Sequence, residues 1–377
     1  MGKIDELIKD LCPDGVEWLE LCDIVKNVTP PIKIKIDSYL DSGIYPIIDQ
    51  GKKQISGYTN EIEYTLPENE YILYGDHTLS VKYYDGRFAQ GADGLKILTC
   101  SNSLTKFIYY CICTYNIQSC EYKRHWTKVK KIKLPLPSLS IQQQIVEILD
   151  TFTDAISNLQ EELELRERQM EYYREKLFDF NEDEYEWKYI PEVASYSTGL
   201  TYKPTNISDS GILVLRSSNI KDNTLSYDDN VFVQMGIPNR SKIHKNDILI
   251  CVRNGSKKLV GKCAYISELK YECAFGAFMN ILRAHSIDSK FLYYSWLLNS
   301  TINQYKGDDA APICQITNKD FNRIKIPVPS LTRQQEIVDI LDTFESMITN
   351  IKEEIELRQK QYEYYREKLL TFERKEA

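Results

Sequence analysis

The side chains best suited to chemistry in this chain lie in short polar and basic segments. The clearest is Arg253–Lys258, where three cations flank the Asn254-Gly255 turn signal. A projecting basic loop suits a DNA groove, because lysine and arginine neutralise phosphates. A solvated hairpin tip without a ligand is the alternative. The DNA-contact candidates in this segment are Arg253, Asn254, Ser256, Lys257 and Lys258.

A second polar run, Arg216–Asn219, follows a predicted strand. Arginine, serine and asparagine form hydrogen bonds with base edges and phosphates. An ordinary turn at the end of a strand has the same composition, and the two interpretations weigh equally here. The candidates are Arg216, Ser217, Ser218 and Asn219.

The first half of the chain has its own basic segment, from Lys123 to Lys133. It holds six lysines and arginines in eleven residues and no acid, which favours phosphate contact. Three further loops, Gln50–Gln54, His77-Thr78 and Lys82–Arg87, are weaker signals. The candidates in this half are Lys52, Lys53, His77, Lys82, Arg87, Lys123 and Arg124.

Signals for catalysis or metal binding are missing from the sequence. There is no GxGxxG or GxxxxGK[ST] phosphate loop, no HExxH and no [ND]PP[YF] adenine-methylation motif. The ten cysteines include no CxxC pair, and Cys111-Ile-Cys113 lies in an apolar run typical of buried structural thiols. We therefore expect a recognition protein that is not an enzyme, with no metal or cofactor bound directly.

These candidate loops alternate with a segment that occurs twice. Residues 132–178 reappear as residues 324–370, without a gap and with 30 of 47 positions identical. The stretches that precede the two copies are similar in length and dissimilar in sequence. The arrangement predicts two different recognition units held on two matched supports.

Each copy is predicted to be one long helix. A proline-spaced extended stretch comes first, and the pairs Ser140/Gln143 and Thr332/Gln335 then fit a capping box. No proline or glycine follows until well past the repeat. A helix of nearly forty residues, on the order of 55–60 Å long, is expected.

The apolar residues of each copy follow a strict 4-3 spacing, the pattern of a coiled coil. Arg166 and Arg358 interrupt both seams at the same place, where a charge costs stability and fixes the register. The two helices are expected to pair within the chain, antiparallel, with a domain at each end. The alternative is two amphipathic helices that each pack only on their own domain.

The variable segments are predicted to be α+β domains. In the second, residues 247–253 and 259–265 read as a hairpin closed by Asn254-Gly255. A helix is expected over 291–298, and 107–113 matches it, which suggests a shared topology. The predicted boundaries are 1–133 and 181–325 for the two domains, and 134–180 and 326–377 for the helical regions.

Bulk composition fits a soluble protein of two domains in the cytoplasm. The net charge of −8 first argues against nucleic acid. However, residues 140–180 carry a net −6 and residues 332–377 a net −3, so the remainder is +1. Acid therefore concentrates on the helices, and the variable segments are free to display basic faces.

The chain resembles the specificity (S) subunit of type I restriction-modification systems. The resemblance rests on the P-L-P-S-L-x-x-Q-Q-x-I-V-x-I-L-D pattern at residues 135–150 and its copy at 327–342. Three motifs of the second variable segment add to it: Leu215–Ile220, Asp247–Ile250 and Ala274–Met279.

This resemblance implies two target-recognition domains, each reading one half of a split DNA sequence, spaced by an antiparallel coiled coil. It also implies two methyltransferase (M) subunits, which methylate adenine with S-adenosylmethionine, and restriction (R) subunits that use ATP and Mg. Double-stranded DNA would be the ligand of this chain itself. The alternative is a stand-alone DNA-binding or coiled-coil scaffold protein without a methyltransferase partner.

Overall fold

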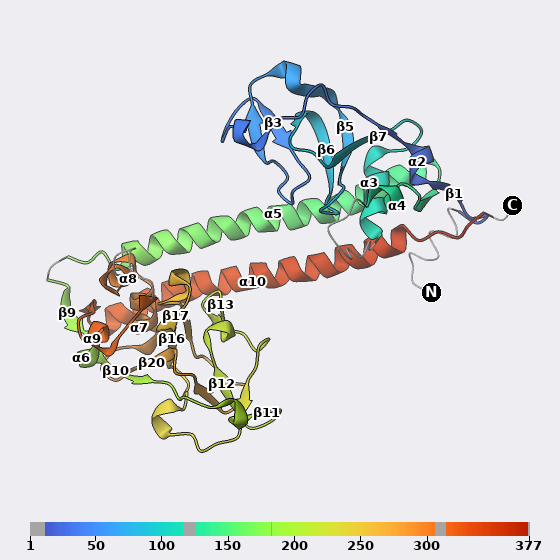
Figure 1. The fold of residues 1–377 in the computed structure, drawn as a ribbon. Coiled ribbons are helices and arrows are strands. Elements are labelled where there is room, and N and C mark those ends of the chain that lie inside the picture. The colour runs from blue at the N-terminus through green and yellow to red at the C-terminus, as the bar shows by residue number, and fades with distance from the viewer. Residues whose placement is uncertain (1–11, 116–124, 182, 306–313, 376–377) are drawn as a thin grey trace. The chain divides into compact units, whose positions relative to one another are not determined.

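A computed structural model of the chain describes residues 12–115, 125–181, 183–305 and 314–375 (Figure 1). It divides into two compact units: unit 1 comprises residues 1–161 and 352–377, and unit 2 comprises residues 162–351. No helix among the described residues is long and apolar enough to span a membrane.

Unit 1 is built on one six-stranded sheet in the order β2-β7-β5-β6-β3-β4. All its neighbours are antiparallel except β3 and β6, which run parallel. The central strand β5 owes its place to the run Tyr71–Tyr74, which is almost completely buried. The strands are β2 (Val25–Asn27), β3 (Tyr45–Ile48), β4 (Gly57–Thr59), β5 (Thr65–Gly75), β6 (Val81–Gln90) and β7 (Leu95–Cys100).

Unit 2 has two four-stranded sheets, in the orders β10-β20-β16-β18 and β11-β15-β12-β19. In the second sheet β12 and β19 run parallel. The strands of these sheets are β10 (Ala194–Thr198), β11 (Ile207–Ser208), β12 (Ile212–Leu215), β15 (Phe232–Val233), β16 (Ile248–Cys251), β18 (Cys263–Tyr265), β19 (Cys273–Phe275) and β20 (Met279–Ala284). Unit 2 also has small two-stranded ribbons: β13 (Ile220–Lys221) with β14 (Thr224–Leu225), β17 (Arg253–Asn254) with β21 (Cys314–Gln315), and β9 (Tyr185–Tyr189) with β22 (Lys325–Pro329).

The expected shared topology is confirmed. The order β2-β7-β5-β6 of unit 1 and the order β10-β20-β16-β18 of unit 2 use their strands in the same chain sequence, all antiparallel. The parallel pair recurs as well. In unit 1 β3 pairs in parallel with the end of β6, and in unit 2 β12 pairs in parallel with β19. One long strand of unit 1, β6, thus corresponds to the two short strands β18 and β19.

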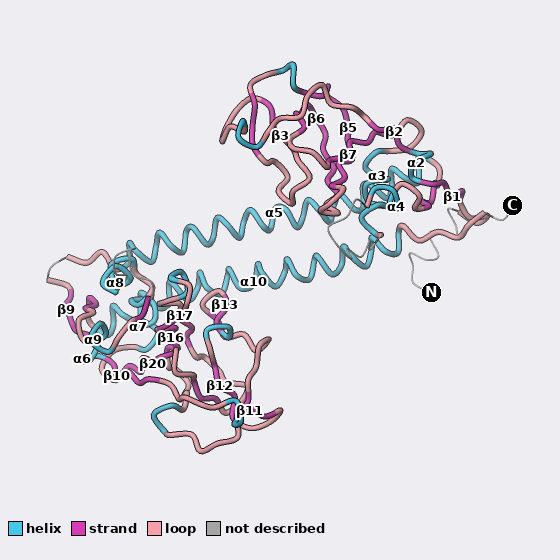
Figure 2. Tube along the Cα trace, viewed as in Figure 1, coloured by secondary structure: helices cyan, strands magenta, loops and turns pink. Residues whose placement is uncertain are grey.

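The expected helices are present as α3 (Thr105–Thr114) and α7 (Ser289–Trp296). The short helices are α2 (Leu21–Ile24), α4 (Trp126–Val129), α6 (Ile190–Val193), α8 (Asn299–Tyr305) and α9 (Asn318–Phe321). The described helices α2, α3 and α4 of unit 1 have counterparts in α6, α7 and α9 of unit 2, which in addition has α8. Figure 2 separates helix, strand and loop along the trace.

The repeated segments form the long helices α5 (Leu139–Leu177) and α10 (Leu331–Leu369). Each is entered from a strand that pairs with the start of its unit: β8 (Lys133–Leu136) with β1 (Glu17–Glu20), and β22 (Lys325–Pro329) with β9 (Tyr185–Tyr189).

The predicted capping boxes are wrong by two residues. The Gln142 and Gln334 N–H groups donate to the carbonyl oxygens of Ser138 and Ser330, so these serines precede the first helical residue. The side chain of Gln143 instead donates to Glu147 at 3.0 Å, one turn along the helix.

The helices pair antiparallel within each unit, as expected. In unit 1 the start of α5 shares a core with the end of α10, and the Phe152 and Tyr365 rings stack at 4.9 Å. In unit 2 the end of α5 shares a core with the start of α10, and Tyr173 stacks on Phe344 at 5.3 Å. The same two repeat positions therefore meet in both units, and such pairs add about 0.5–1.5 kcal/mol beyond area burial.

The two seam arginines are half-buried and satisfied by their own helix. Arg166 bonds Glu162 and Gln169 at 3.3 and 3.1 Å, and Arg358 bonds Glu354 and Gln361 at 2.7 and 3.1 Å. Exposed pairs of this kind contribute about 0.2–1 kcal/mol. The expectation of a buried charge in the seam is wrong in the described structure, because both side chains are partly exposed, at 35% for Arg166 and 43% for Arg358; their role in fixing the register stays a prediction.

Candidate nucleic-acid interface

Three loops meet at one edge of the unit 1 sheet. They are residues 49–54 after β3, residues 76–80 between β5 and β6, and residues 91–94 between β6 and β7. Gln50 joins them, because its side-chain amide donates to the Asp93 carbonyl at 3.0 Å and accepts from the His77 N–H at 3.3 Å. We call this set the three-loop edge of unit 1; its loops are pink in Figure 2.

The corresponding loops meet in unit 2. They are residues 216–219 after β12, 252–262 between β16 and β18, and 276–278 between β19 and β20. Asn254 donates to the Ser217 hydroxyl at 3.3 Å, and the Val252 N–H donates to the Phe278 carbonyl at 2.9 Å. This set is the three-loop edge of unit 2.

The predicted hairpin is present with a different turn. β16 and β18 pair as expected, but eleven residues connect them, from 252 to 262, in place of a two-residue turn. Within this loop Arg253-Asn254 pairs with β21, and the Asn254 side chain accepts the Ser256 N–H at 3.0 Å. This Asx turn fixes the conformation of the loop, so no tight two-residue turn between β16 and β18 is needed.

Most of the predicted contact residues lie on these two edges. In unit 1 these are Lys52, Lys53 and His77; in unit 2 they are Arg216, Ser217, Ser218, Arg253, Asn254, Ser256, Lys257 and Lys258. Lys52, Lys53, Arg253 and Lys258 are exposed. The edges therefore offer accessible cations beside polar side chains and backbone groups, which is the composition of a phosphate- and base-contacting surface.

Three of the predicted contact residues do not fit this role. Lys82 is buried and its ammonium donates to the carbonyls of Asp49, at 2.9 Å, and Lys53. Burial lowers the pKa of Lys82. Arg87 lies within β6 and not in one of the three loops, and it donates to the Thr65 hydroxyl at 3.1 Å.

Asn219 is the third. It is completely buried, its side-chain oxygen accepts the Arg216 N–H at 2.9 Å, and its amide donates to two backbone carbonyls at 3.1 Å. Lys82 and Asn219 thus brace the two loops from beneath, and direct DNA contact through either is wrong for this structure.

Lys123 and Arg124 lie outside the described residues. The segment resumes at His125, which is buried and whose N–H donates to the Asp76 carbonyl at 3.1 Å. The Trp126 N–H donates to the Asp76 carboxylate at 2.8 Å. The described part of the basic segment therefore starts beside the three-loop edge of unit 1.

An apolar pocket that sequence reasoning missed lies at the edge of unit 2. Its volume is about 550 Å³, and it is lined by Leu200, Tyr202, Ile207, Arg216, Ser217 and Phe278, among others. Arg253 lies over the Phe278 ring, 5.3 Å from its centroid. The sequence singles out the Ala274–Met279 motif, but nothing in the motif indicates that Phe278 is exposed.

Arg216 is held at the mouth of the pocket by an acid. Its guanidinium lies 2.7 Å from the Asp229 carboxylate. A hydrogen bond from Ser218, and then the charge of Arg216, lower the pKa of Asp229. A phosphate at this position would have to compete with that carboxylate for Arg216.

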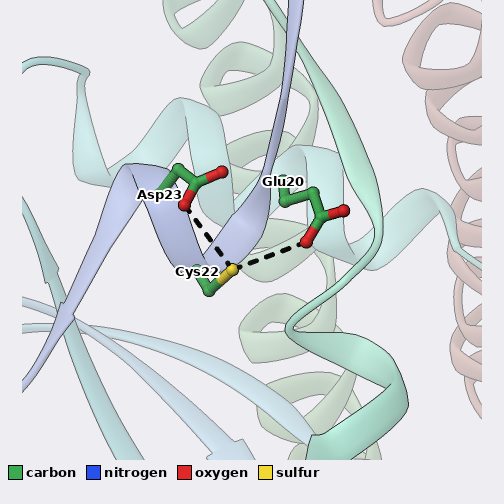
Figure 3. A group of neighbouring side chains, drawn as sticks. All are labelled: Glu20, Cys22 and Asp23. Carbon is green, nitrogen blue, oxygen red and sulfur yellow. Dashed lines mark hydrogen bonds between the residues drawn. The ribbon is translucent and has the colours of Figure 1, made fainter.

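One side-chain group in the described residues has metal-ligand geometry. Glu20, Cys22 and Asp23 bring one ligand atom each within 4.8 Å of one another (Figure 3). Desolvation first, and then Asp23 and Glu20, raise the pKa of the Cys22 thiol. A protonated thiol is a poor ligand, and the group lies on the surface, away from the three-loop edge, as an acidic turn.

Both units are attached to the long helices by the same contacts. Asp150 of α5 accepts from Lys106 at 2.7 Å and Tyr110 at 2.6 Å, and Asp342 of α10 accepts from Lys290 at 2.8 Å and Tyr294 at 2.7 Å.

A buried glutamine near the start of each long helix makes a second contact that is the same in both units. Gln142 accepts the Leu104 N–H at 3.0 Å, and Gln334 accepts the Asp288 N–H at 2.9 Å. The identical positions of the repeat therefore hold the two units in the same way.

Comparison with known proteins identifies the class. The family model of the type I restriction modification DNA specificity domain matches residues 13–167 and 182–357. The chain belongs to this family and is a non-catalytic specificity subunit.

Two curated relatives cover all or nearly all of its length. The EcoR124I/EcoR124II specificity subunit of Escherichia coli is 33% identical over 100% of this chain and 99% of its own. A putative specificity subunit of Haemophilus influenzae is 28% identical over 95% and 96%.

Solved structures support the fold. The S subunit of the M. genitalium type I system superimposes with a TM-score of 0.63 at 17% identity, covering 94% of this chain and 96% of that one. A chain from a study of complex assembly in the type I system gives 0.58 at 14% identity, over 94% and 97%. These likenesses agree with a fold of two α+β domains and a pair of long helices.

Proposed function

We propose that each three-loop edge reads one half of a bipartite DNA target. One observation carries the proposal. The two units have the same topology, and each exposes different polar and cationic loops at the equivalent edge of its own fold. Cations in these loops contact phosphates and set orientation, while polar side chains contact base edges. Of the alternatives, a coiled-coil scaffold protein accounts for the helices but gives these matched loops no role. A stand-alone DNA-binding protein would use the loops, and co-purification with methyltransferase subunits distinguishes it from a specificity subunit.

The energetics favour reading in two halves. A good bidentate base contact supplies about 1–3 kcal/mol of discrimination, so a few contacts on one unit are modest alone. Once one half is bound, engagement of the second becomes intramolecular and gains from a high effective concentration. The paired helices are then the spacer that fixes the separation of the half-sites.

The partners follow from the same role. Two methyltransferase subunits would bind the chain, partly through the helical regions, and would supply S-adenosylmethionine and adenine methylation. Restriction subunits would add ATP- and Mg-dependent cleavage. The acidic helices, with a net −6 over residues 140–180, suit a basic surface on such a partner.

Loss of the gene tests this function. Methylated adenines are mapped across the genome with and without the gene, and with the gene restored on a plasmid. One bipartite methylation motif should vanish and then return. An unchanged methylome would contradict the proposal, since a specificity subunit without an effect on methylation specifies nothing.

A further inference from the structure

We propose that Phe278 and the apolar pocket beside it recognise the 5-methyl group of a thymine in the half-site that unit 2 reads. This inference rests on the proposed function and adds a residue that selects a base. It concerns an aromatic side chain and not the basic loops, and therefore makes a separate prediction.

The first observation is the exposure of Phe278. Its side chain is 56% exposed, although the neighbouring Phe275 and Met279 are completely buried. The core thus obtains its apolar residues from both sides of the turn and does not use Phe278. Phe278 lines the same pocket as Leu200, Tyr202 and Ile207, so its exposed ring belongs to a contiguous apolar patch, and such patches are typical of a contact surface.

The second observation is that the ring is held in place. The N–H groups of Val252 and Arg253 donate to the Phe278 carbonyl at 2.9 and 3.2 Å. The Arg253 guanidinium lies over the ring at 5.3 Å. A contact held on both its backbone and its ring needs little ordering on binding, which favours selectivity.

The third observation is the close packing beneath the turn. A Cβ atom on Gly199 would lie 2.1 Å from the Gly276 carbonyl oxygen. The chain at Leu200 can approach the turn only because residue 199 is glycine, and Leu200 then lines the pocket with Phe278.

The chemistry selects thymine among the bases. In the major groove only the A·T pair presents a methyl group, and phenylalanine is one of the side chains that contact it. Guanine, adenine and cytosine edges instead require donors or acceptors, which the ring of Phe278 lacks. The cations beside it, Arg253 and Lys258, suit the phosphates that flank such a contact.

Unit 1 provides the contrast at the same turn. Gly91 and Gly276 each donate their N–H to the last residue of the parallel strand, Ile48 at 2.9 Å and Leu215 at 3.0 Å. Two residues later unit 1 has Asp93, which pairs with Lys33 at 2.6 Å, where unit 2 has Phe278. The contact through Phe278 therefore has no counterpart at this turn of unit 1.

The test uses the full chain in complex with its methyltransferase subunits. Duplex probes carry the methylated motif, with each thymine replaced in turn by uracil, which lacks only the methyl group. For the natural chain, one thymine in one half-site should show a threefold to fivefold loss of affinity, the factor for one buried methyl group. Phe278→Ala should bind the two probes equally, and Phe278→Leu should keep part of the difference.

A matched control is Tyr271→Ala, which removes another exposed aromatic of unit 2 outside the pocket and should leave the thymine preference unchanged. The proposal is overturned if no thymine is sensitive, or if the sensitivity persists in Phe278→Ala. Failure of the natural complex to prefer its motif over unrelated DNA would instead refute the proposed function.

Discussion

Unit 1 and unit 2 each have a three-loop edge, but different side chains support the loops in the two units. In unit 1 the loop after the parallel strand is braced by the buried ammonium of Lys82, which binds two backbone carbonyls. In unit 2 the equivalent loop is braced by the buried amide of Asn219, with three hydrogen bonds. The strand order and the contacts to the long helices stay constant, while each loop has its own internal support. The comparison indicates that loop sequence can change freely only together with its brace.

The largest effect is expected from removing a brace. Asn219→Ala removes the three hydrogen bonds of a completely buried side chain and should lower the free energy of unfolding by about 3 kcal/mol. Lys82→Met should cost less, because two carbonyls lose their donor. Urea unfolding followed by circular dichroism measures both, with Asn239→Ala as an exposed control. If Asn219→Ala and the natural chain were equally stable, the Asn219 side chain would not support the loop as described.

The second prediction concerns the attachment of the units to the helices. In unit 2 Glu345 also accepts from Lys290 at 3.1 Å and Tyr294 at 3.2 Å, whereas the matching position of the first copy is Thr153. Asp342→Ala therefore keeps a substitute acid and should cost about 1 kcal/mol, while Asp150→Ala should cost about 2 kcal/mol. Thermal unfolding of both variants tests the order, and the reverse order would contradict it.

The third prediction is a loss of stability in alkali. Burial first, and then the neighbouring carboxylates, raise the pKa of Tyr110 and of Tyr294 above the ordinary 10.0. The unfolded chain therefore loses these protons first, so stability is full below about pH 10 and falls above it, by up to about 1.4 kcal/mol per pH unit for each tyrosine. Tyr110→Phe and Tyr294→Phe should each flatten the slope in urea unfolding at pH 10–11. The exposed Tyr172→Phe should not; equal slopes in all variants would argue against the buried phenols.

The smallest effect is expected at the lysines of the two edges. Replacing Lys52 and Lys53, or Lys257 and Lys258, by alanine should weaken binding of the complex to all DNA sequences about equally. Each lost phosphate contact should also reduce the slope of log affinity against log salt by about 1. Fluorescence anisotropy over a salt series measures this. An unchanged slope for one pair would remove that loop from the phosphate-contacting surface.

Sequence reasoning succeeded where the pattern is local. The 4-3 spacing and the absence of proline and glycine predicted both long helices, and the apolar run Phe291–Leu298 predicted α7. It failed where partners come from distant residues. Lys82 reads as a surface cation because the carbonyls it binds lie 29 and 33 positions earlier.

The matched edges were hidden for a related reason. The strand β6 is continuous in unit 1 and divided into β18 and β19 in unit 2, so no fixed spacing relates the equivalent loops. Only the register of the parallel strands, Ile48 with Gln90 and Leu215 with Phe275, aligns them. The exposure of Phe278 between two buried neighbours depends on that same alignment.

The central claim is that the two edges read separate half-sites. It is tested most directly by mapping methylated adenines in cells that carry His77→Ala in unit 1 or Asn254→Ala in unit 2, with the natural methyltransferase partner. We expect each variant to relax the bases accepted in one half of the motif, a different half for each, with the other half and the spacing unchanged. A change in the same half for both variants, or in both halves at once, would contradict the account.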